Sequence, residues 1–303
     1  MPRSPRRYGG ILHLLHIASR QFAKILITVL ACGFAGGALA RYSEGFGLDA
    51  EELDARLSDS ARQHLREVRS EGTDFIHYYP AYVVRLARGD MGYSFTLNRP
   101  IRELISDRLP LTLFEIIDGV AVSGILAVGA ALLSYHNQSR TITLTLDSLC
   151  SLSLCLPVAI MGYICVWLRI NPSCALGLCT FPYLFRYTAN GLETLRLSGH
   201  VIAARSRGVS ALRILSIHIL LPCVPGILAV AEVAVAIAFG AAIPVEFATE
   251  TPGLGQLAWQ AATARDLPLI CVLTMIVTTF VLSANGIVRL LEACFSFDRG
   301  LQR

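Results

Sequence analysis

The chain has 303 residues, of which 54% are hydrophobic and only 16% charged, and its mean hydropathy is +0.56. This composition is too apolar for an ordinary soluble domain of that length and predicts a membrane protein. The formal net charge of +4 does not indicate a nucleic-acid-binding protein, because the basic residues are spread over segments between apolar stretches. Lys24, the single lysine, follows Ala23, so the sequence lacks the G-K pair of a phosphate-binding loop and any ATP must bind elsewhere.

Six stretches of the sequence are nearly free of charged residues: 25–40, 119–139, 141–168, 170–185, 214–245 and 267–288. A helix needs about 20 residues to cross the hydrocarbon core, so the first and fourth stretches are short and the others are long enough. Helices are expected because an open strand edge in lipid would leave backbone groups without hydrogen bonds. The sequence therefore predicts an all-α membrane protein with about six transmembrane helices.

The distribution of basic residues predicts the orientation. If residues 1–24 are cytoplasmic, most Lys and Arg lie in cytoplasmic segments, whereas the short outer loops hold only Arg169 and Arg265. We therefore expect both termini in the cytoplasm, span 1 at residues 25–40 and an extracytoplasmic segment at residues 41–108. An alternative is that the apolar run ending in the A-L-A of residues 38–40 is a cleaved signal peptide, which would leave an odd number of spans.

The extracytoplasmic segment has two recognisable parts. Ser58 or Asp59 can cap a surface helix, because both residue types favour helix N-termini. Further along, Tyr78, Tyr79 and Tyr82 are expected at the membrane interface as an aromatic belt, with carbohydrate binding as an alternative.

Three acidic residues in apolar spans are candidates for function, because ionisable groups at membrane depth usually face a bundle interior or water. Glu115 and Asp118 are three residues apart and share a helix face. They either line a polar cavity or reach water at the interface. Glu232 lies near the middle of the fifth span, where it is expected to line a path or to pair within the bundle.

Residues 196–217, called here the arginine segment, form a basic interruption between two apolar stretches. Arg205, Arg207 and Arg213 are expected on the cytoplasmic side. Their guanidinium groups can contact an acidic partner, although the positive-inside rule alone is an alternative explanation for these arginines. Gly208 can adopt a positive φ, so we expect two short helices joined by a sharp turn there.

A second irregular segment follows the fifth span. Pro252, Gly253 and Gly255 predict a tight turn, and a short amphipathic piece containing Trp259 comes next. Irregular backbone at a membrane is tolerated where it is buried in protein or faces a cavity, although a plain outer loop is the alternative.

Taken in order, the strings GDMGYSF, RPIRELISDRLPLTL, SLCLPVAIMG, AARSRG, VEFATETPGLG and ARDLP resemble the membrane subunits of ABC importers of the dipeptide, oligopeptide and nickel class. The resemblance runs from about Gly89 to Asp298. It implies a type I importer permease with a transmembrane permease domain at residues 109–303. Within this domain, the arginine segment would be the coupling loop that docks on an ATPase, and the PGLG turn would be an outer re-entrant piece.

The resemblance assigns roles to particular positions. The ATPase-coupling loop would comprise Ala203, Ala204, Arg205, Arg207, Gly208, His218 and Pro225. The residues that match the outer motif are Glu246, Pro252, Gly253, Leu254, Gly255, Arg265, Asp266 and Pro268. We expect a translocation path or outer gate formed by Glu246, Pro252, Gly253 and Gly255 together with Glu115, Asp118 and Glu232.

The arginine segment departs from the family pattern at three positions. Gly199 stands where the family usually has an acid, His200 where it favours tyrosine, and Pro222 where it has asparagine. These differences predict a coupling contact that is weaker or specialised.

The expected function is a permease subunit of an ATP-driven importer, with peptides as the default substrate of the class and nickel or other small solutes as alternatives. The resemblance implies four kinds of contact: a second homologous permease, ABC ATPase subunits that bind ATP and magnesium, an extracytoplasmic substrate-binding protein, and lipid of a bacterial inner membrane. For this chain itself we expect no cofactor, no metal, no nucleic acid and no enzymatic activity.

Three other classes of function are alternatives to a permease. A non-transporting scaffold is the main rival, because Gly199 replaces the expected acid. A membrane enzyme would need a nucleophile, base or metal constellation, and none is evident in the sequence. A secondary transporter would be expected to show inverted repeats, and no clear repeat is present.

Overall fold

The computed structural model describes the backbone of residues 6–42, 75–94, 96–137 and 139–300, with side chains described between residues 19 and 290 of those ranges. The helix predicted from Ser58 or Asp59 lies outside the described residues. Contacts divide the chain into two compact units. Unit 1 comprises residues 1–107 and 258–279, and unit 2 comprises residues 108–257 and 280–303.

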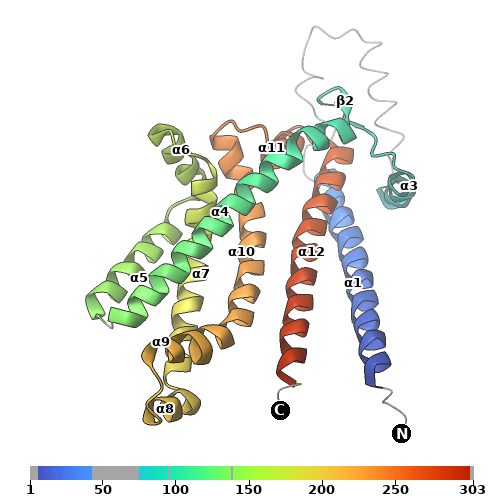
Figure 1. The fold of residues 1–303 in the computed structure, drawn as a ribbon. Coiled ribbons are helices and arrows are strands. Elements are labelled where there is room, and N and C mark those ends of the chain that lie inside the picture. The colour runs from blue at the N-terminus through green and yellow to red at the C-terminus, as the bar shows by residue number, and fades with distance from the viewer. Residues whose placement is uncertain (1–5, 43–74, 95, 138, 301–303) are drawn as a thin grey trace, which may run out of the picture. The chain divides into compact units, whose positions relative to one another are not determined.

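The described chain is almost entirely helical, which confirms the predicted all-α class (Figure 1). The α-helices are α1 (Arg6–Tyr42), α3 (Phe75–Ala87), α4 (Ile101–Asn137), α5 (Arg140–Cys155), α6 (Val158–Leu168), α7 (Ser173–Arg196), α8 (Gly199–Ser206), α9 (Ala211–Arg213), α10 (Leu221–Ala248), α11 (Leu254–Thr263) and α12 (Leu267–Gly300). A π-helix, η1 (Ile214–Leu220), joins α9 to α10. Two short strands, β1 (Tyr93–Ser94) and β2 (Arg99–Pro100), pair in antiparallel.

Four helices of the described chain are long and apolar enough to cross a membrane: Ser19–Tyr42, Ile101–Asn137, Ala211–Ala248 and Leu267–Leu290. A fifth crossing results if α5 and α6 count as one span, although the two are bent by 103°. The stretch 141–168, predicted as one span, is therefore broken into two helices. Pro157 explains the break, because proline lacks an N–H and disfavours the helical conformation of the preceding residue. Leu156 is accordingly extended, with φ −80° and ψ 128°.

The predicted count of six spans also includes residues 170–185, which fall largely in α7, and α7 is not among the span candidates. The physical reason is that α7 faces protein. Its buried residues include the polar side chains of Ser173, Thr180 and Thr188. It runs antiparallel to α10, since Tyr187 lies against Gly226 and Cys223 against Gly191. A helix covered by neighbours in this way needs less apolar character than one that faces lipid.

Two helices of unit 2, α4 and α7, approach each other closely. A Cβ added at Gly119 would lie 2.7 Å from the carbonyl oxygen of Ser173, and one at Gly177 would lie 3.0 Å from the carbonyl oxygen of Gly119. Four residues further along α4, Ser123 accepts a hydrogen bond from the Thr180 hydroxyl at 3.1 Å. Small residues permit this backbone contact, and the order of the pairs shows that α4 and α7 run in the same direction.

In unit 1, glycines of α1 pack against aromatic and small side chains. Positions Gly33 and Gly37 lie directly against Met275 and Cys271, respectively. The first candidate span is 24 residues long rather than the predicted 16-residue stretch 25–40. Gly33 and Gly37, which precede the possible cleavage site, thus pack into the interior of unit 1.

The tyrosines of α3 also belong to this interior, so the predicted aromatic belt is wrong for two of them. Tyr79 and Tyr82 are only 7% and 1% exposed. The Tyr79 hydroxyl donates to the Leu30 carbonyl at 2.6 Å, and the Tyr82 hydroxyl lies 3.2 Å from the Pro268 carbonyl. Burial raises the pKa of Tyr78 to about 12, so this phenol stays neutral at physiological pH.

The glycine contact between α4 and α7 gives a first test. Gly119→Ala places a methyl group against the Ser173 carbonyl, a backbone atom that cannot rotate away. We expect a loss of about 1–3 kcal/mol in the free energy of unfolding, measured by denaturation in mixed micelles. The matched control is Gly124→Ala on the same helix, where an added Cβ meets nothing within 4 Å. Equal stability of the two variants would contradict the close approach.

Candidate functional site

A buried carboxylate joins three helices of unit 2. Glu246, near the end of α10, is fully buried. Its Oε1 accepts a hydrogen bond from Thr112 Oγ1 of α4 at 2.7 Å. Its Oε2 accepts the backbone N–H groups of Gly255 and Gln256, in the first turn of α11, at 2.7 and 3.1 Å. The first N–H groups of a helix have no partner within it and carry partial positive charge, so the carboxylate satisfies and stabilises this helix end.

The two glycines of the PGLG turn make this contact possible. A Cβ at Gly253 would lie 2.2 Å from Glu246 Oε2, and one at Gly255 would lie 2.5 Å from the Ala242 carbonyl oxygen. Thr112 Oγ1 completes the arrangement by accepting the Leu254 N–H at 2.7 Å. The structure thus brings three predicted residues together, Glu246, Gly253 and Gly255. The predicted Pro252 lies beside them and is exposed.

The predicted pair Glu115 and Asp118 separates into two environments. Glu115 is 3% exposed, and its Oε2 has no hydrogen-bond partner in the part of the chain that is described. Asp118 accepts a hydrogen bond from the Ser173 hydroxyl at 2.6 Å and lines a cavity of about 460 Å³ between α4, α5 and α7. Of the two acids, Asp118 lines this cavity and Glu115 does not. Glu232 is partly buried on α10, with no hydrogen bond to any described residue.

A second carboxylate organises unit 1. Asp266 is 3% exposed and precedes α12, where its Oδ1 accepts the Leu269 N–H at 3.3 Å. Its Oδ2 accepts the Ser94 hydroxyl at 2.6 Å and the Thr96 N–H at 3.2 Å. The GDMGYSF and ARDLP strings therefore meet through Ser94 and Asp266. Neither Ser94 nor Thr112 is predicted from the sequence as a site residue.

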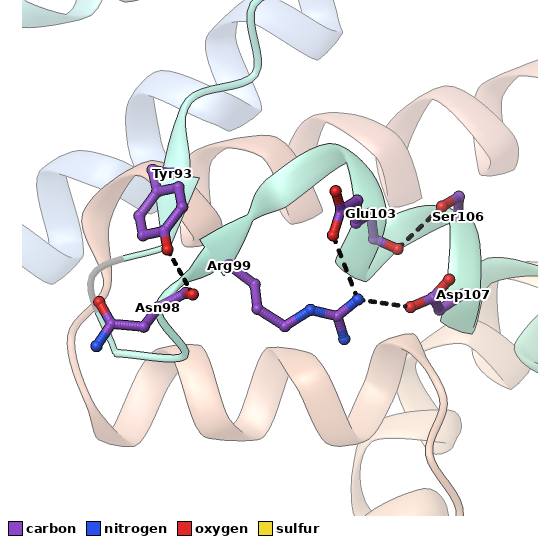
Figure 2. A network of polar contacts seen from close by, with 6 residues as sticks. All are labelled: Tyr93, Asn98, Arg99, Glu103, Ser106 and Asp107. Atoms are coloured by element: carbon purple, nitrogen blue, oxygen red, sulfur yellow. Dashed lines mark hydrogen bonds and ion pairs between the residues drawn. The ribbon is translucent and has the colours of Figure 1, made fainter.

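The start of α4 carries an exposed polar network (Figure 2). Arg99 of β2 lies 3.4 Å from Glu103 and 3.1 Å from Asp107, and hydrogen bonding, chiefly to Asp107, raises the pKa of its guanidinium. The Tyr93 hydroxyl donates to the Asn98 carbonyl, which closes the β1–β2 turn. Solvent-exposed ion pairs contribute little to stability, so this network orients the hairpin relative to the first turns of α4.

The arginine segment has the predicted form. Gly208 has φ +77° and joins α8 to α9, which confirms a turn at this position between two short helices. Ala204 is buried, whereas Ala203 is exposed. The side chains of Arg205, Arg207 and Arg213 are exposed. Leu212 is 81% exposed, and Ile202 is 57% exposed. The segment therefore presents basic and apolar side chains without a covering partner in the described chain.

Two departures from the family pattern meet at one carbonyl group. Pro222 has no N–H, so it cannot donate the α-helical hydrogen bond to the carbonyl of His218. His200 of α8 has its Nε2 3.2 Å from that same carbonyl oxygen. His200 thus ties α8 to η1 at the carbonyl to which Pro222 cannot donate. Pro225, which the resemblance also assigns to the coupling loop, lies inside α10.

The buried polar groups of both units have a structural role in the described chain. Among the residues that the structure describes, no group of three or more His, Cys, Asp and Glu side chains is placed to hold a metal ion. The buried carboxylates of Glu246 and Asp266 instead fix helix starts and the segments that precede them.

This combination of membrane-spanning helices, a glycine turn held on a buried glutamate and an exposed basic helix pair is that of a transport-system membrane component. Residues 119–296 match the family described as binding-protein-dependent transport system inner membrane component, and the chain belongs to this family.

Several named relatives are similar to the chain. A Brucella suis biovar 1 protein, named provisionally as a peptide transport system permease, is 27% identical over 207 residues, which cover 60% of this chain and 66% of the relative. The oligopeptide transport system permease protein OppB of Haemophilus influenzae is 26% identical over 255 residues, covering 77% and 81%. The glutathione transport system permease protein GsiC of Escherichia coli O6:H1 is 23% identical over 239 residues, covering 72% and 76%. The match thus spans just under two thirds of the Brucella relative.

The Glu246 site gives a second test. Glu246→Gln replaces one acceptor oxygen by an NH₂ group. If the remaining amide oxygen accepts the N–H groups of Gly255 and Gln256, the buried Thr112 hydroxyl loses the oxygen to which it donates. We expect a loss of about 1–3 kcal/mol in the free energy of unfolding, because an unsatisfied buried polar group bears its full desolvation cost. Glu232→Gln is the matched control on the same helix, and denaturation of the purified full chain measures both. Little or no loss at Glu246 would contradict the hydrogen-bonding scheme.

Proposed function

We propose that this chain is a permease subunit of an ATP-driven importer whose substrates are peptides or peptide-like molecules. The observation that carries the proposal is membership of the binding-protein-dependent transport family over residues 119–296. The relatives are named for peptide, oligopeptide and glutathione transport, which favours a peptide-like solute over nickel or other small solutes.

The arginine segment supports docking on an ATPase subunit. Its exposed guanidinium groups offer several fixed donors to an acidic surface, and its exposed apolar side chains can be buried by a partner. Gly208 and the contact between His200 and His218 hold the segment in one shape. A preorganised surface loses less conformational entropy on docking than a flexible loop does.

The rest of the proposed assembly follows from the family and the charge distribution. The chain would pair with a second homologous permease and accept substrate from an extracytoplasmic binding protein. Both termini would lie in the cytoplasm of a bacterium, and the Glu246 site would face the opposite side, as part of an outer gate. ATP and magnesium would bind to the ATPase subunits.

A scaffold without transport activity is the competing function. It is favoured by Gly199, which offers no acidic group at the position where the family usually has one. An added Cβ at Gly199 meets nothing within 4 Å, so packing does not account for the glycine.

Co-purification separates the two functions. The tagged full chain, extracted from its own membrane in mild detergent, is expected to bring down two ABC ATPase subunits and a second permease in stoichiometric amounts. The complex should hydrolyse ATP faster when its binding protein and a peptide are added. Recovery of the chain without any ATPase would contradict the proposal and favour the scaffold.

The turn at Gly208 gives the corresponding mutational test. Gly208→Ala forces an L-residue to hold φ +77°, which costs about 1–2 kcal/mol and displaces the following residues. We expect substrate-stimulated ATP hydrolysis by the reconstituted complex to fall severalfold, while insertion into the membrane is unchanged. Gly199→Ala in the same segment is the matched control, because its added methyl group enters open space. Wild-type stimulation in Gly208→Ala would contradict the role of the turn.

A further inference from the structure

The cavity beside Asp118 is a chamber with mainly apolar walls and one charged group. Its volume is about 460 Å³, within the range of about 300–1,000 Å³ that small-molecule sites occupy. The apolar lining comprises Gly119, Val122, Leu126, Leu149, Leu152, Leu156, Cys174, Gly177, Leu178 and Phe181. Apart from Asp118, the polar lining is three serine hydroxyls, from Ser123, Ser153 and Ser173.

Each of these serines already has a hydrogen-bond partner. Ser153 donates to the Leu178 carbonyl at 2.8 Å, Ser123 lies 3.1 Å from the Thr180 hydroxyl, and Ser173 donates to Asp118 at 2.6 Å. Asp118 is the one lining group that carries charge. Its only polar partner in the described chain is the neutral Ser173 hydroxyl, which leaves the negative charge without a counter-ion.

The charge lies at one end of the cavity lining. Along the stretch where α4 and α7 line the cavity, Asp118 and Ser173 pair at one end, and Leu126 and Phe181 lie at the other. Eight residues of α4 separate Asp118 from Leu126, which corresponds to about 12 Å along the helix axis. A ligand that fits this shape has one cationic end and an apolar body.

We propose that this cavity binds an apolar molecule with a single ammonium group, and that Asp118 is the counter-ion of that group. A charge inside a membrane protein is stabilised by an opposite charge close by. The ammonium group of the ligand would therefore neutralise the Asp118 carboxylate. This inference rests on the proposed function in one respect, the identity of the ligand. A peptide-like solute with apolar side chains and a free N-terminus matches both the chemistry of the cavity and its dipeptide-sized volume.

The experiment measures binding by the full chain in lipid nanodiscs, without ATP or partner subunits. The probes are Leu-Phe amide, which has a free ammonium group, and N-acetyl-Leu-Phe amide, which is neutral and otherwise alike. We expect the free amine to bind at least about tenfold more tightly than the acetylated probe, because one charge-assisted hydrogen bond is lost on acetylation. In Asp118→Asn this preference should disappear. Asp147→Asn, an acid-to-amide change on α5 away from the cavity lining, should keep it.

The results test the ammonium site separately from the proposed transport function. Equal binding of the two probes to the wild-type chain would overturn it, and would fit a cavity filled by a lipid acyl chain. Absence of binding by the free amine, or an unchanged preference in Asp118→Asn, would also overturn it. The acetylated probe tests the charge without any variant, so misfolding of Asp118→Asn cannot hide the answer. Loss of transport in the complete system would instead contradict the proposed function.

Discussion

The buried carboxylate of Glu246 is the interaction on which the functional part of unit 2 depends. A buried acid in a membrane protein is stabilised where donors meet its oxygens, and at Glu246 these donors are Thr112, Gly255 and Gln256. The same contact fixes the start of α11 and dictates glycine at two positions of the turn, because any side chain there would occupy the space of the carboxylate or of the α10 backbone. The α4, α10 and α11 segments are therefore joined by a single polar group.

This arrangement connects to the proposed coupling through one continuous helix. Residues Ala211–Ala248 form a single 38-residue span candidate, with the arginine segment at its beginning and Glu246 near its end. At about 1.5 Å per residue the helix is long enough to cross the hydrocarbon core. A displacement imposed on α8 and α9 by a partner would thus be passed along α10 to the contact with α11. The hydrogen bond between His200 and the His218 carbonyl lies at the base of this helix, where Pro222 cannot donate to that carbonyl.

Much of this architecture can be predicted from sequence, because hydropathy and glycine chemistry are local properties. The apolar stretches, the turn at Gly208 and the short helix containing Trp259 follow from residues that lie close together in the chain. The contacts of Ser94 and Thr112 do not, since their carboxylate partners are 172 and 134 residues away and a hydroxyl residue has no pattern of its own. The sequence pattern also misjudges Tyr79 and Tyr82 of α3, because it cannot distinguish a side chain at a membrane interface from one covered by protein. The break before Pro157 had a local signal, but the apolar run around it concealed the bend.

The central claim is that Glu246 acts through its hydrogen bonds to α4 and α11 rather than merely by filling space. A double-mutant cycle tests it most directly, using the free energies of unfolding of Thr112→Val, Glu246→Gln and the double variant in mixed micelles. Because Thr112 and Glu246 share one hydrogen bond, the double variant should lose less stability than the sum of the single losses, by at least about 0.5 kcal/mol. Additive losses would show that the two side chains do not interact and would contradict the account.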